Sequence, residues 1–457
     1  MRVKKNETFQ GGKKEMKIMK KTIVIVLTAC LLFALVSCKG KSDSRAAAAA
    51  PESKSSREQI AEIIEKSPLG LNGIQPNPLQ DRAHINKALP VQKKDPHNVT
   101  IGYTAQSLGS VFFLTILETL QEECAKYGYN LIYQVADFNI ELQAQQVDAF
   151  IAMGVDVIIV NGNTQSHTAT FRRSADAGIP ILATANQPAE WDSSVLTDFL
   201  TSSYQAGWLV GEYTGKHMYQ PGKVYKMGFI FNAMGSADTE SRANGFLTGF
   251  QYAMRELDGK PYESTWDAIL DGYQMWRTFA DRGRHTSPDG RVEFVGMGVG
   301  GQPTMEGGQR AANDLVAANR DMDVLFVETD NMWPGVEVVL RQNGLTAGKD
   351  LIVACAADAT KFGMEAVMSG EILAVGNNSS AMNVYGMMDV IRGMYEFGEN
   401  DKMNNLPANI FTPTVAITKE NVHEFYDPDR NLAKGMPFDL LTIPEFNANV
   451  GSDGPPF

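Results

Sequence analysis

Apolar segments of five to eight residues alternate with longer helical segments from Asn98 onward. The short segments have the length and composition of buried strands. They cover residues 99–104, 130–136, 155–161, 179–185, 224–231, 292–299, 322–327, 351–356 and 372–376. The predicted helices between them cover residues 112–127, 141–153, 166–177, 204–218, 238–254, 304–318, 333–342 and 360–368. Apolar strands separated by helices are typical of parallel sheets that are covered on both faces.

Nine such strands exceed one ordinary open sheet, so the pattern predicts an α/β fold with two doubly wound parallel-sheet lobes. Ligands bind at the carboxyl ends of the strands in such sheets. The residues just after the predicted strands are mostly amides, hydroxyls, carboxylates and aromatics. These groups suit a sugar, because amides and carboxylates bind hydroxyls and aromatic faces pack on C–H groups. For any single Asn or Asp the alternative is a turn or helix cap, as at Asp330 and Asn331 before Trp333-Pro334.

The N-terminus has the pattern of a secretory signal. A basic stretch ending at Lys21 precedes an uncharged apolar run over residues 22–36, which is shorter than the roughly 20 residues of a membrane-spanning helix. The run ends in Leu-Val-Ser-Cys, which resembles the bacterial lipobox, with Cys38 as the acylated residue. The pattern therefore predicts removal of residues 1–37 and a lipid anchor at Cys38, on the extracytoplasmic side of a bacterial membrane. The alternative is an uncleaved N-terminal anchor, which also places the rest of the chain outside.

Residues 38–96 are predicted to form a tether and an irregular N-terminal segment, with a short amphipathic helix over residues 57–66. The first part is polar, alanine-rich and free of aromatic residues. Residues 1–37 carry eight basic and two acidic residues, so the formal net charge of −12 becomes −18 without them. A chain this acidic repels nucleic acids and anionic membrane surfaces, so we expect no nucleic acid as a partner. Solubility outside the cell is the simpler explanation of the same charge.

Cysteine usage and motif spacing argue against an enzyme. Outside the signal and the lipobox only Cys124 and Cys355 remain, and we expect both to be buried thiols. The sequence has no zinc-type Cys/His spacing, nucleophile elbow or phosphate loop, and the glycine-rich stretch from Gly296 lacks the dinucleotide-binding spacing. We therefore expect no catalytic activity, metal or cofactor.

Six motifs occur in a characteristic order and spacing between about Asn98 and Lys419. They are Ile-Gly-Tyr-Thr-Ala-Gln-Ser-Leu-Gly-Ser-Val-Phe-Phe (101–113), Lys-Tyr-Gly-Tyr (126–129), Gly-Val-Asp (154–156), Ala-Gly-Ile-Pro (177–180), Arg-Ala-Asn-Gly-Phe (242–246) and the segment led by Asp358. Together they resemble the ribose-binding-protein group of periplasmic sugar-binding proteins. The resemblance implies two lobes of the type I periplasmic-binding-protein kind, joined by a hinge that the chain crosses three times.

The same resemblance implies the limits of the lobes. The first lobe would comprise residues 97–203 plus 379–410. The second would comprise residues 204–378 plus 411–430, followed by a C-terminal tail over residues 431–457. The hinge crossings would lie near positions 203, 378 and 411.

The candidate ligand-binding residues come from the resemblance and from the ends of the predicted strands. The resemblance implies sugar contacts at Ser110, Phe112, Phe113, Asn161, Asn186, Asp358 and Asn378. Further candidates are Gln106, Glu240, Arg242, Thr329 and Trp333.

The chain departs from the ribose-type pattern at several of these positions. Ala185-Asn186 replaces an Asp-Arg pair, and Glu240 replaces a second arginine, so ribose in the same pose is not the expected ligand. Trp333 is a candidate for a replacement stacking face. Residues 262–291 have no counterpart in the pattern and could form a surface hairpin, a helix or a lid.

The resemblance implies a monomeric lipoprotein that captures a small polar ligand, a mono-sugar above all, and delivers it to an ABC permease. A sensory lipoprotein that presents its ligand to a membrane receptor is the alternative. Sugar-responsive repressors share the two-lobed core, but they would carry an N-terminal helix-turn-helix and a basic surface in place of an export signal. Pentose, hexose, polyol and nucleoside all remain open as the ligand.

The lipobox generates a direct prediction. Cys38→Ala removes the thiol that would be acylated, so we expect the variant to lose fatty-acid labelling and to remain unprocessed or to be released from the membrane. Metabolic labelling followed by membrane fractionation checks this, and fatty-acid label retained on the variant would contradict the assignment.

Overall fold

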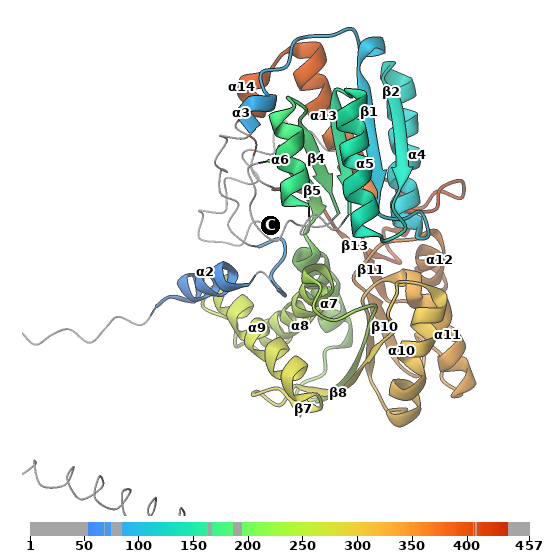
Figure 1. Ribbon diagram of the computed structural model, residues 1–457. Helices are drawn as coiled ribbons and strands as arrows, with labels where there is room; N and C mark the ends of the chain where they lie inside the picture. The colour runs from blue at the N-terminus through green and yellow to red at the C-terminus, as the bar shows by residue number, and fades with distance from the viewer. Residues whose placement is uncertain are drawn as a thin grey trace, which may run out of the picture. The chain divides into compact units, whose positions relative to one another are not determined.

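Two mainly parallel β-sheets with helices on both faces form the framework of the protein (Figure 1). The computed structural model describes residues 54–67, 69–74, 85–162, 167–185, 194–404, 406 and 409–436. All of these residues belong to one compact unit that begins at Lys54. The predicted signal, Cys38, the start of the tether and most of the C-terminal tail lie outside the described residues.

The first lobe contains a six-stranded, fully parallel sheet in the order β12-β5-β4-β3-β1-β2. Its strands are β1 (Thr100–Ala105), β2 (Asn130–Val135), β3 (Val157–Asn161), β4 (Ile181–Thr184), β5 (Thr197–Thr201) and β12 (Asn409–Thr412). Helices α4 (Val111–Tyr127) and α13 (Ser380–Arg392) pack on one face. Helices α5 (Ile140–Met153) and α6 (Thr168–Asp176) pack on the other.

The second lobe contains a seven-stranded sheet in the order β13-β11-β10-β9-β6-β8-β7. Its parallel strands are β6 (Tyr225–Phe231), β8 (Val292–Val299), β9 (Val324–Val327), β10 (Ile352–Cys355) and β11 (Ala374–Gly376), and its antiparallel edges are β7 (His285–Thr286) and β13 (Ala416–Thr418). One face carries α7 (Ser203–Met218), α8 (Ala237–Leu257) and α9 (Thr265–Arg282). The other carries α10 (Met305–Ala318), α11 (Trp333–Gln342) and α12 (Lys361–Ser369).

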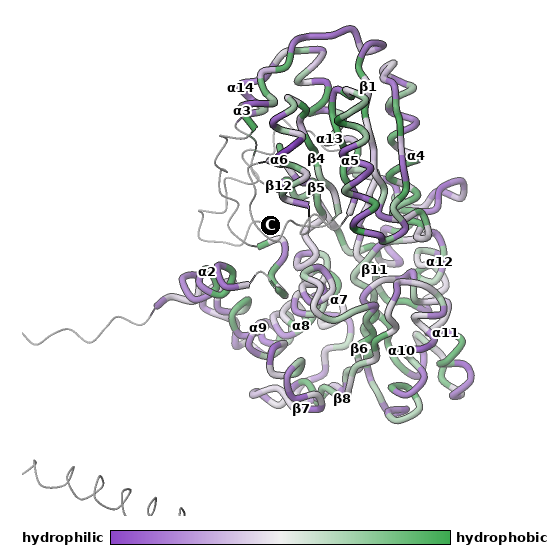
Figure 2. Tube along the Cα trace, viewed as in Figure 1, coloured by the Kyte–Doolittle hydropathy of each residue, from purple (hydrophilic) through white to green (hydrophobic). Residues whose placement is uncertain are grey.

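Short elements complete the described part of the chain. They are α2 (Ser56–Lys66), α3 (Ile85–Ala88), α14 (Asn400–Met403), α15 (Val422–Phe425), the 3-10 turns η1 (Pro96–Asn98) and η3 (Asp330–Met332), and the π-helical turn η4 (Gly393–Phe397). Apolar residues concentrate along strands such as β6, and polar residues lie on outward-facing stretches of the helices (Figure 2). No helix in the described ranges is both long and apolar enough to cross a membrane.

All nine predicted strands and the eight helices predicted between them are present, with ends that differ by at most three residues. The short helix predicted over residues 57–66 is also present, as α2. The structure also contains elements that the apolar pattern did not predict. Strand β5 was missed because Thr-Asp-Phe-Leu-Thr lacks a continuous apolar run, and β7, β12 and β13 because they are short. The segment over residues 262–291 contains α9, which packs against α8.

The chain passes between the two sheets three times. The connections follow β5, β11 and β12, and lead into α7, α13 and β13 respectively. The exact limits of the lobes stay a prediction.

Helices α7 and α8 approach each other closely because glycines face each other at their crossing. A Cβ atom on Gly207, Gly211, Gly245 or Gly249 would lie 2.1 Å from a backbone oxygen of the opposite helix. Only glycine permits this approach. The close packing fixes the first turns of both helices, and these turns reach the region between the lobes.

Candidate functional site

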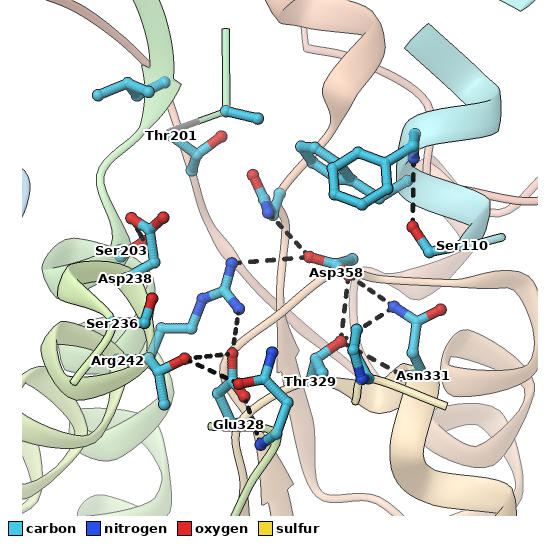
Figure 3. Close-up of a pocket in the computed structure, with 18 of the residues that line it drawn as sticks. Ser110, Thr201, Ser203, Ser236, Asp238, Arg242, Glu328, Thr329, Asn331 and Asp358 are labelled. Carbon is cyan, nitrogen blue, oxygen red and sulfur yellow. Dashed lines mark hydrogen bonds and ion pairs between the residues drawn. The ribbon is translucent and has the colours of Figure 1, made fainter. Parts of the chain in front are cut away.

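A cavity of about 140 Å³ lies where the carboxyl ends of both sheets meet (Figure 3). Its lining comes from both lobes: Ser110, Phe112, Phe113, Ala185, Leu200, Thr201, Ser203, Asn232, Ser236, Asp238, Thr239, Arg242, Pro303, Glu328, Thr329, Asn331, Asp358, Asn378 and Asn383. Pockets for drug-sized ligands measure about 300–1,000 Å³. This cavity therefore suits a small ligand.

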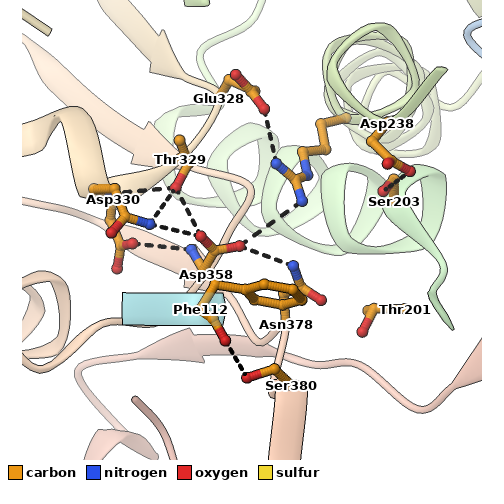
Figure 4. Close-up of polar contacts among 12 residues, drawn as sticks. Phe112, Thr201, Ser203, Asp238, Glu328, Thr329, Asp330, Asp358, Asn378 and Ser380 are labelled. Atoms are coloured by element: carbon orange, nitrogen blue, oxygen red, sulfur yellow. Dashed lines mark hydrogen bonds and ion pairs between the residues drawn. The ribbon is translucent and has the colours of Figure 1, made fainter. Parts of the chain in front are cut away.

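The Asp358 carboxylate lies at the centre of a hydrogen-bond network in this cavity (Figure 4). Its Oδ2 atom accepts hydrogen bonds from Thr329 Oγ1 at 3.1 Å and from Asn331 Nδ2 at 2.6 Å. Its Oδ1 atom accepts one from Asn378 Nδ2 at 2.8 Å. The side chain is buried, and these donors offset the cost of removing a carboxylate from water.

A buried ion pair joins this network from α8. Arg242 Nη1 lies 2.8 Å from Glu328 Oε1, and Arg242 Nη2 lies 3.8 Å from Asp358 Oδ1. Burial raises the pKa of Glu328, which is 1% exposed, and the positive charge of Arg242 opposes this rise. Burial also acts to lower the pKa of Arg242, but the neighbouring carboxylates outweigh it and the pKa lies above its usual value. The guanidinium is thus held charged between two carboxylates.

The turn that carries Asp358 is fixed by Asp330 from the neighbouring strand end. Asp330 accepts hydrogen bonds from the backbone N–H groups of Asp358 at 2.9 Å and Thr360 at 2.7 Å. Burial and the nearby Asp358 charge raise the pKa of Asp330 to about 7. Thr360 caps α12 by accepting from the Gly363 N–H, so Asp358 is not the cap of that helix. Asp330 is likewise not a cap of its own turn, because Thr329 fills that role for η3.

The first lobe supplies an aromatic wall. The ring centroids of Phe112 and Phe113 lie 5.6 Å apart in an edge-to-face arrangement. Ser110 caps α4 by accepting a hydrogen bond from the Phe113 N–H at 3.4 Å, and Ser380 Oγ donates to the Phe112 carbonyl at 3.0 Å. The phenylalanines therefore sit at a capped helix start that is bonded to α13.

The structure brings seven of the expected ligand-binding residues to the cavity. They are Ser110, Phe112, Phe113, Arg242, Thr329, Asp358 and Asn378. Asn186 lies outside the described residues.

Four expected residues are placed away from the cavity lining. Asn161 is fully buried and joins two strand ends, accepting from the Gln106 N–H at 3.4 Å and donating to the Thr184 carbonyl at 3.3 Å. Gln106 forms the turn after β1, where its carbonyl accepts from the Phe138 N–H. The structure therefore gives both residues a local structural role.

Glu240 and Trp333 are the other two expected residues that lie away from the cavity lining. Glu240 pairs with Arg277 at 3.3 Å and accepts from Trp276 Nε1 at 3.2 Å, which ties α9 to α8. Trp333 is 3% exposed and packs in the core of the second lobe. Trp333 therefore does not supply a stacking face to the cavity in this structure.

Polar lining residues outside the expected set are Thr201, Ser203, Asn232, Ser236, Asp238, Thr239, Glu328, Asn331 and Asn383. Glu328 directly follows β9, so the strand-end rule could have identified it. Thr201 and Ser203 flank the connection after β5, a strand that the apolar pattern missed.

Among the described residues, no group of three or more His, Cys, Asp or Glu side chains could hold a metal ion. Cys124 and Cys355 are free and buried, as expected.

Two doubly wound lobes with a polar cavity between them define a two-lobed solute-binding protein. The family model described as a periplasmic binding protein domain matches residues 101–399. The chain belongs to this family, whose members bind solutes and are not enzymes. The resemblance to the ribose-binding group is confirmed.

Curated relatives match this chain at low identity. The ribose import binding protein RbsB of Bacillus subtilis is 26% identical over 160 residues, which is 35% of this chain and about half (51%) of that protein. RbsB of Escherichia coli is 21% identical over 277 residues, covering 60% of this chain and 77% of that protein.

Two solved solute-binding proteins of ABC transporters have the same fold. The protein from Actinobacillus succinogenes with bound D-allose has a TM-score of 0.57 at 17% identity, over 72% of this chain and 100% of that one. The protein from Bacillus halodurans with bound myo-inositol has a TM-score of 0.53 at 21% identity, over 73% of this chain and 99% of that one.

The buried Arg242–Glu328 pair generates a pH-dependent prediction. Arg242→Met leaves the Glu328 carboxylate buried without its cation, at a cost of about 3–5 kcal/mol at neutral pH. The pKa of Glu328, already raised by burial, should rise further, and a raised carboxyl pKa contributes stability at low pH that is lost as the pH rises. We therefore expect urea denaturation to show a larger loss of unfolding free energy at pH 8 than at pH 5.

The control is the double variant Arg242→Met/Glu328→Gln, which removes the buried charge and should flatten most of the pH dependence. An equal loss of unfolding free energy at pH 5 and pH 8 in Arg242→Met would contradict the pairing of Arg242 with Glu328.

Proposed function

We propose that this protein captures a neutral sugar or polyol in the cavity between its lobes and delivers it to an ABC permease. The observation that carries the proposal is the composition of the cavity wall. Hydrogen-bond acceptors and donors from the second lobe face an aromatic pair from the first. Sugars need both kinds of surface, because their hydroxyls form hydrogen bonds and their C–H faces pack on aromatic rings.

The charge of the wall favours a neutral ligand. Among the described residues of the lining, Asp238, Glu328 and Asp358 are acidic and Arg242 is the one cation. This excess of carboxylates would repel a sugar phosphate or a sugar acid. A neutral hydroxyl can donate to a carboxylate instead, and a hydrogen bond to a charged group contributes about 1.5–3 kcal/mol.

The proposed ligand contacts are the seven expected residues that line the cavity, joined by Asp238, Asn331 and Glu328. Phe112 and Phe113 would flank the sugar ring, while Arg242, Asp358 and Asn378 would bind its hydroxyls. Contacts from both lobes would favour a closed arrangement, because a ligand shifts an equilibrium by its differential affinity for the two states.

The names of the relatives support this class of ligand and partner. Structures of the same fold hold D-allose and myo-inositol, and the curated relatives are import binding proteins for ribose. Ala185 lines the cavity where the ribose-type pattern has a charged residue, so we do not propose ribose in that pose. The predicted signal and lipobox support an extracytoplasmic protein that is anchored through Cys38. The expectation of a monomer stays a prediction.

A thermal-shift screen tests the proposal. The panel is D-allose, D-arabinose, D-galactose, myo-inositol and D-ribose, with glucose 6-phosphate and L-leucine as non-matching controls. We expect one neutral sugar or polyol to stabilise the protein, by about 2.7 kcal/mol at 100 times its dissociation constant. D-ribose should bind more weakly than that ligand in calorimetric titration. Stabilisation by a control compound alone would contradict the proposal.

Asp358 tests the site itself. Asp358→Asn directs an amide N–H₂ group at side chains that now donate to the carboxylate, so stability should fall by about 2–4 kcal/mol. The affinity for the ligand from the screen should fall about tenfold or more, because a charged acceptor is lost. Melting temperature and calorimetric affinity are measured together, with Asp314→Asn on the exposed face of α10 as the matched control. Reduced stability with unchanged affinity would contradict the assignment of Asp358 to the ligand.

A further inference from the structure

The N-terminal segment formed by residues 54–67 and 69–74 packs on the second lobe, well before the family domain begins at residue 101. Helix α2 lies against α9, an element without a counterpart in the ribose-type pattern (Figure 1). Leu71 and Ile74 are buried together with Tyr204 and Trp208. The segment therefore continues from α2 towards the connection between the lobes.

Asn72 is one of the fully buried residues of this segment. Its backbone N–H donates to Ser241 Oγ at 2.7 Å, and its carbonyl accepts from the Tyr204 N–H at 3.0 Å. The residue is 0% exposed and is held between the first turns of α7 and α8. The next residue, Gly73, adopts a φ of 103°, and a Cβ there would lie 2.0 Å from Ser202 Oγ. The segment thus fits directly against the first hinge connection.

The side chain of Asn72 donates a hydrogen bond from Nδ2 to Oδ1 of Asp238, a residue of the cavity wall. Ser203 Oγ donates to the same oxygen at 3.1 Å, and Figures 3 and 4 show this pair beside the cavity. No hydrogen bond from the described residues is seen at Oδ2 of Asp238. One carboxylate oxygen is therefore fixed, and the other is available to a ligand.

Among the described residues, Asp238 is the one hydrogen-bond partner of the Asn72 side-chain amide. Its Oδ1 atom is buried without a hydrogen-bond partner, which is unfavourable for stability. Burial raises the pKa of Asp238, and Arg242, Ser203 and Asn72 oppose that rise. Burying this amide lowers stability, and its Nδ2 atom donates to a carboxylate of the cavity wall. This geometry is the one expected of a residue that orients the carboxylate.

We propose that Asn72 is a positioning residue of the ligand site. It fixes Oδ1 of the Asp238 carboxylate, so that Oδ2 is oriented to accept a ligand hydroxyl. The N-terminal segment is then part of the binding machinery as well as the end of the tether. This inference rests on the proposed function, because it assigns a hydroxyl-bearing ligand to Asp238.

The test compares two matched truncations. Asn72→Ala removes the donor to Asp238. Asn244→Ala removes a donor to the Gly70 carbonyl, which holds the same segment without contacting the cavity. In calorimetric titration with the best-binding neutral sugar or polyol of the panel, Asn72→Ala should bind about tenfold more weakly, as expected for the loss of a hydrogen bond to a charged group. Asn244→Ala should bind as the unmodified protein does, even where its melting temperature falls by a similar amount.

A second readout needs no ligand. The pKa of Asp238 is measured by carbon-detected NMR of the carboxyl groups in aspartate-labelled protein, with Asp238→Asn to assign the signal. Asn72→Ala should raise the pKa of Asp238 and Asn244→Ala should leave it unchanged. An Asp238 pKa that is the same in both variants overturns the inference, whether or not any sugar binds. If the unmodified protein binds no member of the panel, the proposed function fails, and the NMR result still decides the role of Asn72.

Discussion

Three carboxylates and one guanidinium share the described wall of a small cavity, and the cost of removing these charges from water constrains the structure around them. Arg242 lies between Glu328 and Asp358, and neutral donors from Thr329, Asn331 and Asn378 complete the coordination of Asp358. A buried charge is tolerated only when it is paired and hydrogen-bonded. The strand ends, the η3 turn and the start of α8 are therefore held in one arrangement, which leaves a preformed polar surface for a ligand.

The framework that positions this network was largely predictable from the sequence. Continuous apolar strands and helical spacing revealed the strand–helix units of both lobes, because burial on both faces of a parallel sheet requires them. Strand β5 and the short edge strands β7, β12 and β13 were not predictable in this way. Strand β5 contains Asp198 between threonine and phenylalanine, so it lacks an apolar run although all of its residues are buried. The N-terminal segment could not be placed either, because its docking depends on α9, which the pattern left undefined.

The strand-end rule found the region of the site, but it did not select which polar residues face the cavity. On α8, positions 238 and 242 are four residues apart and share one helix face, whereas Glu240 lies on the opposite face and pairs with Arg277. Helical periodicity contained this information. The preference for Glu240 came instead from the family resemblance. Trp333 is a second residue that the strand-end rule misplaced. It lies at a helix start near the cavity, but its side chain packs in the core beneath.

The central claim is that a ligand binds between the lobes and contacts both of them. A crystal structure of the protein with its best-binding neutral sugar or polyol measures this directly. The account predicts density in the cavity, with the sugar ring against Phe112 and Phe113 and its hydroxyls bonded to Asp358, Arg242 and Asp238. Ligand density that contacts one lobe alone, or that lies outside this cavity, would contradict it.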